Sequence, residues 1–372
     1  MLTPVSGNEG TTLQSESPSK FNARDFRLSP GARAAAAAGT AITDPVERGE
    51  RYKPGASEVR VNPDLGPRPA WMRVSTPNHG KLKELEAQVH EKKLNTVCES
   101  ANCPNRGECW SLGTATLMIL GNICTRSCGF CAIKTGRPTE LDLDEPERVA
   151  DTVEWMKLRY VVITSVDRDE LKDGGAGVWA STIRAVRARC PEVGIEVLIP
   201  DFMGIEANQQ IVFDARPHVL AHNLETVERM HRTVRPQARY QRSLDVITNA
   251  KRAGLVTKSG MMLGIGERAD EVPVAMQALR DAGCDVLTLG QYLQPTPAHL
   301  PIERWVTPQE FEEHRATALE MGFSKCDSGP LVRSSYHAEG VISPDSPLRD
   351  VVAQAIGEAA AAAMDAAQEI GE

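Results

Sequence analysis

The chain has 372 residues, of which 41% are hydrophobic and 25% are charged, so it is long enough for one large domain with appendages. Its net charge of -8 disfavours a general nucleic-acid binder, which needs a basic face, although a local patch can still meet an acidic protein partner. No apolar run reaches the roughly 18 residues of a membrane span, and the N-terminus lacks the charged start and apolar stretch of a secretory signal. We therefore expect a cytoplasmic protein that binds neither nucleic acid nor membrane.

Residues 1–68 are rich in Pro, Gly, Ser and Ala and contain few large apolar side chains. Such a stretch cannot offset the entropy of ordering, so we expect a disordered N-terminal extension. Residues 69–112 form the next segment, which begins at "RPAWMRV", where Trp71 and Met72 can dock on a folded domain. It continues as a charged helix, "KLKELEAQVHEKK", and then carries three cysteines. Residues 329–372 form a C-terminal segment that ends in a solvent-facing helix.

Between residues 113 and 328, short apolar runs rich in β-branched side chains alternate with helical stretches. The predicted strands cover residues 116–122, 160–166, 195–200, 218–223, 256–263 and 285–293. The predicted helices cover residues 146–157, 178–189, 207–215, 224–253, 270–282 and 308–321. Apolar strands separated by helices of this length indicate parallel βα units that are buried on both faces. Six such units favour an α/β fold, a partial, open (β/α)6 TIM-like barrel, with a doubly wound sheet as the alternative. Both place the functional site beyond the carboxyl ends of the strands.

Nine cysteines in a reducing compartment indicate metal or redox chemistry and not a disulfide framework. Cys124, Cys128 and Cys131 lie in "CTRSCGFC", directly after the first predicted strand, with the spacing C-x3-C-x2-C. Three thiolates this close can hold three corners of a cubane [4Fe–4S] cluster and leave one iron open for a substrate or cofactor. A structural zinc site is the alternative, but such sites usually show paired C-x2-C elements with four ligands.

The spacing of this loop, with Phe130 before its last cysteine, resembles the cluster loop of the radical S-adenosylmethionine superfamily. The resemblance implies that the open iron is chelated by the amino and carboxylate groups of S-adenosylmethionine. It further implies that an electron from the cluster cleaves the sulfonium and gives a 5′-deoxyadenosyl radical.

Cys98, Cys103 and Cys109 form the other group, with the spacing C-x4-C-x5-C. Their segment "CPNRGECW", together with "RSSYHA" at residues 333–338, resembles the lipoyl synthases. The resemblance extends over most of the chain after the N-terminal extension and includes "VITSVDRDELKDGGA", "KSGMMLGIGE" and "QYLQPT". It implies an auxiliary [4Fe–4S] cluster held by the three cysteines and by Ser335, whose oxygen is a harder and more replaceable ligand than a thiolate. Without the flanking motif, Ser335 would be assigned to a turn or a cap.

The same resemblance implies insertion of two sulfur atoms at C6 and C8 of a protein-bound octanoyl-lysine, with two S-adenosylmethionine molecules consumed and the auxiliary cluster as sulfur source. The chemistry is consistent with this, because unactivated alkane carbons have no acidic proton and require a cofactor-derived radical. The implied partners are octanoylated lipoyl-carrier domains, of a 2-oxo-acid dehydrogenase E2 or a glycine cleavage H protein, and an electron donor such as ferredoxin or flavodoxin.

Further polar residues lie where strands end, and each has a plainer alternative. Asp167 and Asp169 follow the second predicted strand in "SVDRDE" and are candidates to bind the methionyl amino group, or they belong to a solvated acidic loop. Asn223 ends the fourth strand as another candidate, and Glu267 in "GIGE" could contact a ribose hydroxyl or simply complete a turn. Arg333 could stabilise the auxiliary cluster or pair with a surface acid.

Two other functions compete with this one. Another radical enzyme with an auxiliary cluster, such as a different sulfur inserter or a methylthiolating enzyme, is disfavoured by "RSSYHA" and by the N-terminal position of the extra cysteines. A ferredoxin-like electron carrier is disfavoured by two three-cysteine groups beside a barrel of substrate-binding size. The remaining cysteines match no ligand spacing and are expected to be buried as small hydrophobes; they are Cys190, Cys284 and Cys326.

Overall fold

The computed structural model describes residues 62–73, 87, 89, 91–92, 94–101, 103–343, 345–354 and 357. The predicted disordered extension therefore lies almost wholly outside the described residues, as do most of the charged helix before the first cysteines and the C-terminal helix. The first described stretch ends in a short 3-10 helix, η2 (Ala70–Met72), in which Met72 is fully buried while Trp71 stays 42% exposed. The sequence predicts that Trp71 and Met72 dock on the domain, and this is confirmed for Met72.

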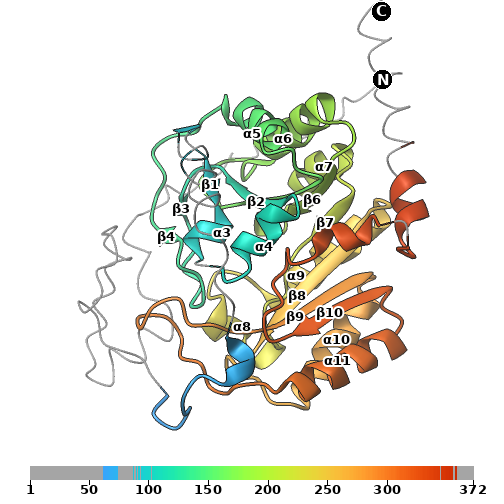
Figure 1. Ribbon diagram of the computed structural model, residues 1–372. Helices are drawn as coiled ribbons and strands as arrows, with labels where there is room; N and C mark the ends of the chain where they lie inside the picture. Colours follow the sequence, from blue (N-terminus) through green and yellow to red (C-terminus); the bar gives the residue numbers. More distant parts are fainter. Residues whose placement is uncertain are drawn as a thin grey trace, which may run out of the picture.

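One eight-stranded sheet forms the centre of the protein (Figure 1). Its strands in spatial order are β1 (Asn95–Thr96), β2 (Thr114–Ile119), β5 (Tyr160–Ser165), β6 (Gly194–Leu198), β7 (Val219–Ala221), β8 (Val256–Leu263), β9 (Val286–Gln291) and β10 (Lys325–Gly329). Every neighbouring pair is parallel except β1 and β2. Because β1 and β10 stand at opposite ends of this order, the sheet stays open within the described residues. The partial, open barrel predicted from the sequence is confirmed.

Helices follow each of the six predicted strands. They are α5 (Glu145–Trp155), α6 (Ala176–Arg189), α7 (Glu206–Asp214), α8 (Glu228–Val234), α9 (Tyr240–Arg252), α10 (Glu271–Asp281) and α11 (Pro308–Glu320). Two shorter helices, α3 (Val97–Ser100) and α4 (Arg106–Ser111), precede β2 and carry cysteines. Local sequence explains the start of α11: the Thr307 side chain accepts the Glu310 N–H, and Pro308 at the first helical position has no N–H that would need an acceptor. Among the described helices, none is both long and apolar enough to cross a bilayer.

The strands are buried on both faces, as parallel strands of a packed barrel require. All six residues of β2 and all six of β9 are buried. Across β5, β6 and β8, the Lys258 ammonium lies 2.9 and 3.0 Å from the two carboxylate oxygens of Glu196, and the Tyr160 hydroxyl donates to the same carboxylate at 3.0 Å. These three side chains are almost completely buried, so each charge depends on its hydrogen bonds to the others.

Two features lie outside the sequence-based prediction. β10, with the sequence "KCDSG", adds a seventh parallel strand beside β9. Its residues are polar and mostly half-buried, so the apolar run that marks a central strand is missing. A separate two-stranded sheet, β3 (Ile123–Cys124) with β4 (Lys134–Thr135), brackets the cysteine loop that follows β2.

Candidate functional site

The small sheet fixes the first cysteine of the loop that follows β2. Cys124 ends β3, pairs with Thr135 of β4, and accepts the Gly136 N–H at its carbonyl oxygen, 2.9 Å away. Its sulfur accepts the backbone N–H groups of Arg126 (3.4 Å) and Asp167 (3.3 Å). The sulfur is therefore held at the carboxyl end of the sheet, beside the loop that follows β5.

Two distant segments hold the rest of this loop. Gly129 donates its N–H to the Val234 carbonyl (2.8 Å) and accepts the Leu300 N–H (2.9 Å). A β-carbon on Gly129 would lie 2.8 Å from Leu300 Cδ1, so glycine is needed where that side chain packs against the backbone. Nε2 of His299 lies 2.9 Å from the carbonyl oxygen of Cys131. The geometry of the loop therefore depends on residues far away in the sequence.

Burial raises the pKa of every thiol in this loop: to about 12 for Cys128, to about 11 for Cys131, and well above the ordinary value for Cys124. Free thiolates are unfavourable here, so the charged forms need a positive partner such as bound iron. Arg235 lies close enough to Cys128 to oppose part of the burial effect on its pKa. Three half-buried thiols that ionise with metal are a suitable donor set for an iron–sulfur cluster.

The two predicted aspartates after β5 have different surroundings. Asp169 accepts a two-pronged hydrogen bond from Arg126, with Nε–Oδ2 and Nη2–Oδ1 distances of 2.8 Å each. Asp167 lies 3.1 Å from Arg126 Nε through Oδ1, but as an ion pair without hydrogen-bond geometry, so this buried oxygen has no donor among the described residues. Burial raises the pKa of Asp167 to about 6, and its Oδ2 is 3.7 Å from Cys124 Sγ. Asp167 thus keeps hydrogen-bonding capacity beside the cysteine loop.

Asn223 and Glu267 also differ in what their side chains can still bind. Asn223 lies just beyond β7, where its buried Oδ1 has no donor within the described part of the chain. Glu267 turns back on its own loop, and its buried carboxylate accepts hydrogen bonds of 2.7 to 3.2 Å from Gly264, Ile265, Gly266 and Arg304. Glu267 braces the turn between β8 and α10. Its contact with a ribose hydroxyl stays a prediction, and it is disfavoured because both carboxylate oxygens already accept hydrogen bonds.

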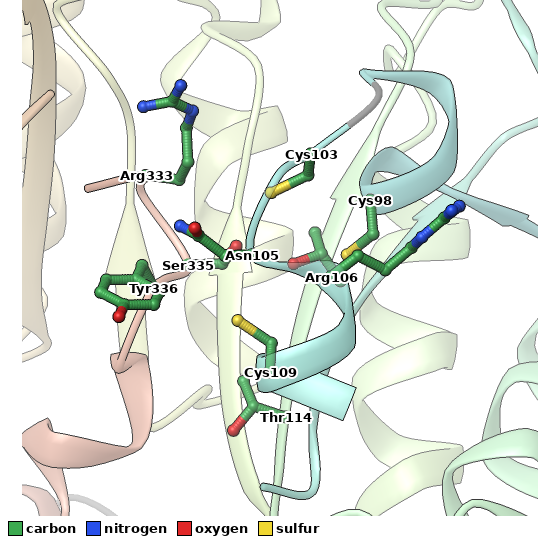
Figure 2. Close-up of a pocket in the computed structure, with 10 residues that line it drawn as sticks. Cys98, Cys103, Asn105, Arg106, Cys109, Thr114, Arg333, Ser335 and Tyr336 are labelled. Atoms are coloured by element: carbon green, nitrogen blue, oxygen red, sulfur yellow. The ribbon is translucent and has the colours of Figure 1, made fainter. Parts of the chain in front are cut away.

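The other three cysteines lie beside the C-terminal segment (Figure 2). Cys98 is on α3, Cys109 is on α4, and Cys103 is in the loop between them. With Ser335 they line a small hollow, whose other walls are Asn105, Arg106, Thr114, Thr116, Arg333 and Tyr336. Figure 2 shows the three sulfur atoms directed toward the space that Ser335 borders. The structure thus brings together the four residues that the sequence grouped.

Burial also raises the thiol pKa values in this hollow, to about 12 for Cys109 and above the ordinary value for Cys103. Arg333 is close enough to Cys103 to lower that thiol's pKa in part, and burial lowers the pKa of the Arg333 guanidinium itself. A half-buried cation beside half-buried thiols favours their ionised forms. The hollow therefore offers three sulfur donors, the Ser335 hydroxyl among several oxygen atoms, and a compensating positive charge.

Within the described residues, no three His, Cys, Asp or Glu side chains converge closely enough to hold one metal ion. A structural zinc needs its four ligands on one ion, whereas a cubane takes each thiolate on a different iron. Each cysteine group supplies three thiols, one fewer than the four ligands usual in a structural zinc site. All nine cysteines are free; Cys284 and Cys326 are buried as predicted, while Cys190 is only partly buried.

Several residues that hold these sites are not among the sequence-based candidates. Arg126 and Asn105 each stand between two of the grouped cysteines in a short motif, and that placement is a usable signal. Asp201, which follows β6, and Arg235, which follows α8, carry no comparable signal, because the fold alone brings them to the cysteine loop.

The chain matches the family model of the radical SAM superfamily over residues 118–279. It is 56% identical over 273 residues to a lipoyl synthase of Rubrobacter xylanophilus, covering 73% of this chain and 85% of that protein. It is 51% identical over 280 residues to a mitochondrial lipoyl synthase of Nematostella vectensis, covering 75% and 96%. Among solved structures, methylornithine synthase is 14% identical with a TM-score of 0.45, over 76% of this chain and 89% of that one. Coproporphyrinogen III oxidase of Escherichia coli is 11% identical with a TM-score of 0.44, over 62% and 58%.

A parallel barrel with a three-cysteine loop after its first long strand, together with the superfamily match, defines a radical S-adenosylmethionine protein. Such a protein uses a [4Fe–4S] cluster and S-adenosylmethionine. The high identity to curated relatives over most of their length goes further: the chain belongs to the lipoyl synthase family and is an enzyme of that type. The resemblance inferred from the motifs is confirmed.

Proposed function

We propose that the chain inserts two sulfur atoms at C6 and C8 of a protein-bound octanoyl-lysine, and that its two cysteine groups have separate tasks in this reaction. The observation that carries the proposal is the single hollow lined by Cys98, Cys103, Cys109 and Ser335. A hydroxyl among three thiols is an unusual donor set for a permanent cluster, but it suits one from which an iron must leave.

The loop of Cys124, Cys128 and Cys131 is the proposed site of the radical-generating cluster. Three half-buried thiols supply three ligands, and the fourth iron stays open for the amino and carboxylate groups of S-adenosylmethionine. The bound cofactor supplies the radical that removes a hydrogen atom from each target carbon. The chain's own task is to hold the loop rigidly and to orient the cofactor.

For the cofactor's ammonium group we propose Asp167 and Asn223, because each has a buried oxygen without a donor among the described residues. An ammonium brings three N–H donors and satisfies such oxygens. Asp169 and Glu267 are assigned supporting roles, since their carboxylates are already bound by Arg126 and by the turn after β8.

For the auxiliary [4Fe–4S] cluster we propose the ligands Cys98, Cys103, Cys109 and Ser335, with the cluster as the sulfur donor. Arg333 lies close enough to Cys103 to act on its pKa, and it would stabilise the negative charge of the ligated cluster. The serine oxygen is the ligand whose release opens the cluster, because an alkoxide binds iron less well than a thiolate and is more readily protonated.

The proposed architecture assigns residues 1–68 to an N-terminal extension, 69–112 to the auxiliary cysteines, 113–328 to the radical barrel and 329–372 to the segment with Ser335.

The substrate is a lipoyl-carrier domain, for which we propose the octanoylated 2-oxo-acid dehydrogenase E2 or the glycine cleavage H protein. The electron donor is of the ferredoxin or flavodoxin kind. Nine free thiols suit a reducing compartment, which supports a cytoplasmic site of action.

The experiment is anaerobic turnover of the reconstituted chain with an octanoyl-lysyl peptide, S-adenosylmethionine and a reductant. We expect mass spectrometry to show a peptide that has gained two sulfur atoms, with two 5′-deoxyadenosine molecules released per product. Release of 5′-deoxyadenosine without any sulfur gain would favour a different radical enzyme. Reduced clusters that release no 5′-deoxyadenosine would favour an electron carrier.

A further inference from the structure

Arg126 stands between two cysteines of the radical loop and is tied to the ends of two other strands. Its side chain is 2% exposed. Its Nε and Nη2 bind both oxygens of Asp169 at 2.8 Å, and Nη2 also lies 2.6 Å from Asp201 Oδ1. Because Asp169 follows β5 and Asp201 follows β6, one guanidinium joins the cysteine loop to the carboxyl ends of two parallel strands.

The same guanidinium faces the carboxylate of Asp167. Arg126 Nε lies 3.1 Å from Asp167 Oδ1, and the other oxygen, Oδ2, is 3.7 Å from Cys124 Sγ. The backbone of the cysteine loop holds the same residue from the other side, since Thr125 donates its N–H to the Asp167 carbonyl at 3.1 Å. The place of this carboxylate beside the first cysteine therefore depends on Arg126.

The support behind Arg126 is rigid. Asp201 is fully buried; it accepts the Met203 N–H at 3.0 Å and lies 3.2 Å from Arg242 Nη1. Phe202 and Met203 both have positive φ, 48° and 56°, which bulky residues adopt only where surrounding contacts impose it. Burial opposes the charge of Asp201, but Arg126 outweighs it and holds the pKa of that carboxyl below its usual range.

We propose that Arg126 is a positioning residue for S-adenosylmethionine: it fixes the Asp167 carboxylate where the cofactor's ammonium binds and so orients the cofactor at the open iron. The inference rests on the proposed function of this loop and adds a residue, outside the ligand set, on which cofactor affinity depends. Arginine suits the task because its planar fork binds two carboxylates at once, whereas a lysine ammonium is a point charge.

A merely structural role makes a different prediction. Arg126 would then only neutralise three nearby aspartates, and its loss would lower iron content and stability without a specific effect on the cofactor. Arg126→Lys separates the two roles, since it keeps the positive charge and removes the fork. Combining this change with Asp167→Asn tests whether Arg126 acts through Asp167.

The test compares Arg126→Lys, Asp167→Asn and the double variant, each as the full chain with both clusters reconstituted. Affinity for S-adenosylmethionine is measured by anaerobic equilibrium dialysis with the clusters left oxidised, so that the cofactor is not cleaved. At parental iron content, we expect about tenfold weaker binding in each single variant, the loss of one charge-assisted hydrogen bond. The double variant should bind no more weakly than Asp167→Asn, because both changes remove the same contact. The KM for S-adenosylmethionine should rise in step, while the maximal rate of 5′-deoxyadenosine release changes less.

Arg187→Lys is the matched control, because Arg187 is a half-buried arginine of α6 that donates to the carbonyls of Ala215 and Arg216. It should bind the cofactor like the parent. If Arg126→Lys fails to take up iron, Asp169→Asn is tested in its place. This variant keeps Arg126 but weakens the paired hydrogen bonds that hold its guanidinium. It should weaken binding of S-adenosylmethionine about threefold or more.

Parental affinity in Arg126→Lys, or in Asp169→Asn where that variant replaces it, would overturn the inference. So would a double variant whose loss equals the product of the two single losses. These outcomes are distinct from failure of the proposed function, since a parent chain that binds S-adenosylmethionine but forms no lipoyl product would refute the function and leave the binding comparison intact.

Discussion

The side-chain amide of Asn105 donates a 2.7 Å hydrogen bond to the backbone carbonyl of Leu331, across 226 positions of the sequence. The bond joins the segment that carries Cys98, Cys103 and Cys109 to the one that carries Ser335. Asn105 is 3% exposed, so an unpaired amide there would be costly. The serine is therefore held beside the three cysteines by a contact that involves none of the proposed ligands.

Gly290 of β9 leaves the space in which the Ser335 segment lies. A β-carbon there would be 2.2 Å from the Val332 carbonyl oxygen, closer than real atoms approach. We expect Gly290→Ala to displace the segment, lower the iron content and slow lipoyl formation about tenfold or more, while 5′-deoxyadenosine release continues. Gly177→Ala is the control, since its β-carbon would meet only the end of the Asp173 side chain at 3.3 Å. Equal iron content in both variants would contradict the prediction.

Replacement of any cysteine of the radical loop should abolish cleavage of S-adenosylmethionine. Two thiolates cannot hold a cubane while one iron stays open, so Cys124→Ala, Cys128→Ala and Cys131→Ala should each release no 5′-deoxyadenosine above background. Chromatographic assay of 5′-deoxyadenosine under reduction provides the measurement. Cys190→Ala, which removes a partly buried thiol outside both groups, should behave like the parent. Cleavage at the parental rate in a loop variant would show that this group is wrongly assigned.

Ser335→Cys should separate cluster binding from turnover. A thiolate holds iron better than an alkoxide, so the variant should keep or increase its iron content, yet form lipoyl product about tenfold more slowly because the iron leaves less readily. Iron analysis before turnover and product yield after it are the two readouts. Unimpaired turnover would show that the reaction does not require a readily released bond between Ser335 and iron.

The free energy of unfolding should decrease as the pH is lowered through the mildly acidic range, because of His218. Burial, with a smaller effect of Arg187, lowers the pKa of His218 from 6.5 to about 4, and the ring accepts the Ile195 N–H at 2.8 Å. The unfolded chain binds a proton near pH 6.5 but the folded chain does not until about pH 4, so the free energy of unfolding decreases as pH falls through this window. The expected slope is about 1.4 kcal/mol per pH unit.

Urea unfolding of the parent and of His218→Asn checks this value. The asparagine oxygen can replace the ring acceptor without taking up a proton, so the parental loss of stability between pH 7.5 and 5.5 should exceed that of the variant by about 1.4 kcal/mol. Cluster lability in acid affects both chains and cancels in the difference. Identical pH dependence would show that His218 does not titrate as its burial requires.

Much of the barrel could be predicted from the sequence, because six of its strands are apolar runs separated by helices: β2, β5, β6, β7, β8 and β9. β10 could not: "KCDSG" has no apolar run, and its strand conformation depends on pairing with β9. β3 and β4 are two residues each, too short for any periodic signal, and they form because their pairing closes the cysteine loop.

The cysteines of the radical loop could likewise be proposed from their spacing, whereas Cys98, Cys103, Cys109 and Ser335 could be proposed as ligands only from the resemblance of their motifs to the lipoyl synthases. The roles of the carboxylates could not. Asp169 and Glu267 occupy the positions expected of cofactor ligands, but their oxygens are bound by Arg126 and by backbone N–H groups, which only the folded chain reveals. Asp201 belongs to no recognisable motif. It binds Arg126 only because the fold brings the end of β6 beside the cysteine loop.

The most direct test of the account separates its two cysteine groups by counting two products of one variant. Cys103→Ala removes a ligand of the proposed sulfur-donor cluster and leaves the radical loop intact. In anaerobic incubation with an octanoyl-lysyl peptide, S-adenosylmethionine and a reductant, 5′-deoxyadenosine and lipoyl peptide are quantified together by mass spectrometry. Cys103→Ala should release 5′-deoxyadenosine but form no lipoyl peptide. A normal lipoyl yield from this variant would contradict the central claim that the hollow of Cys98, Cys103, Cys109 and Ser335 supplies the sulfur.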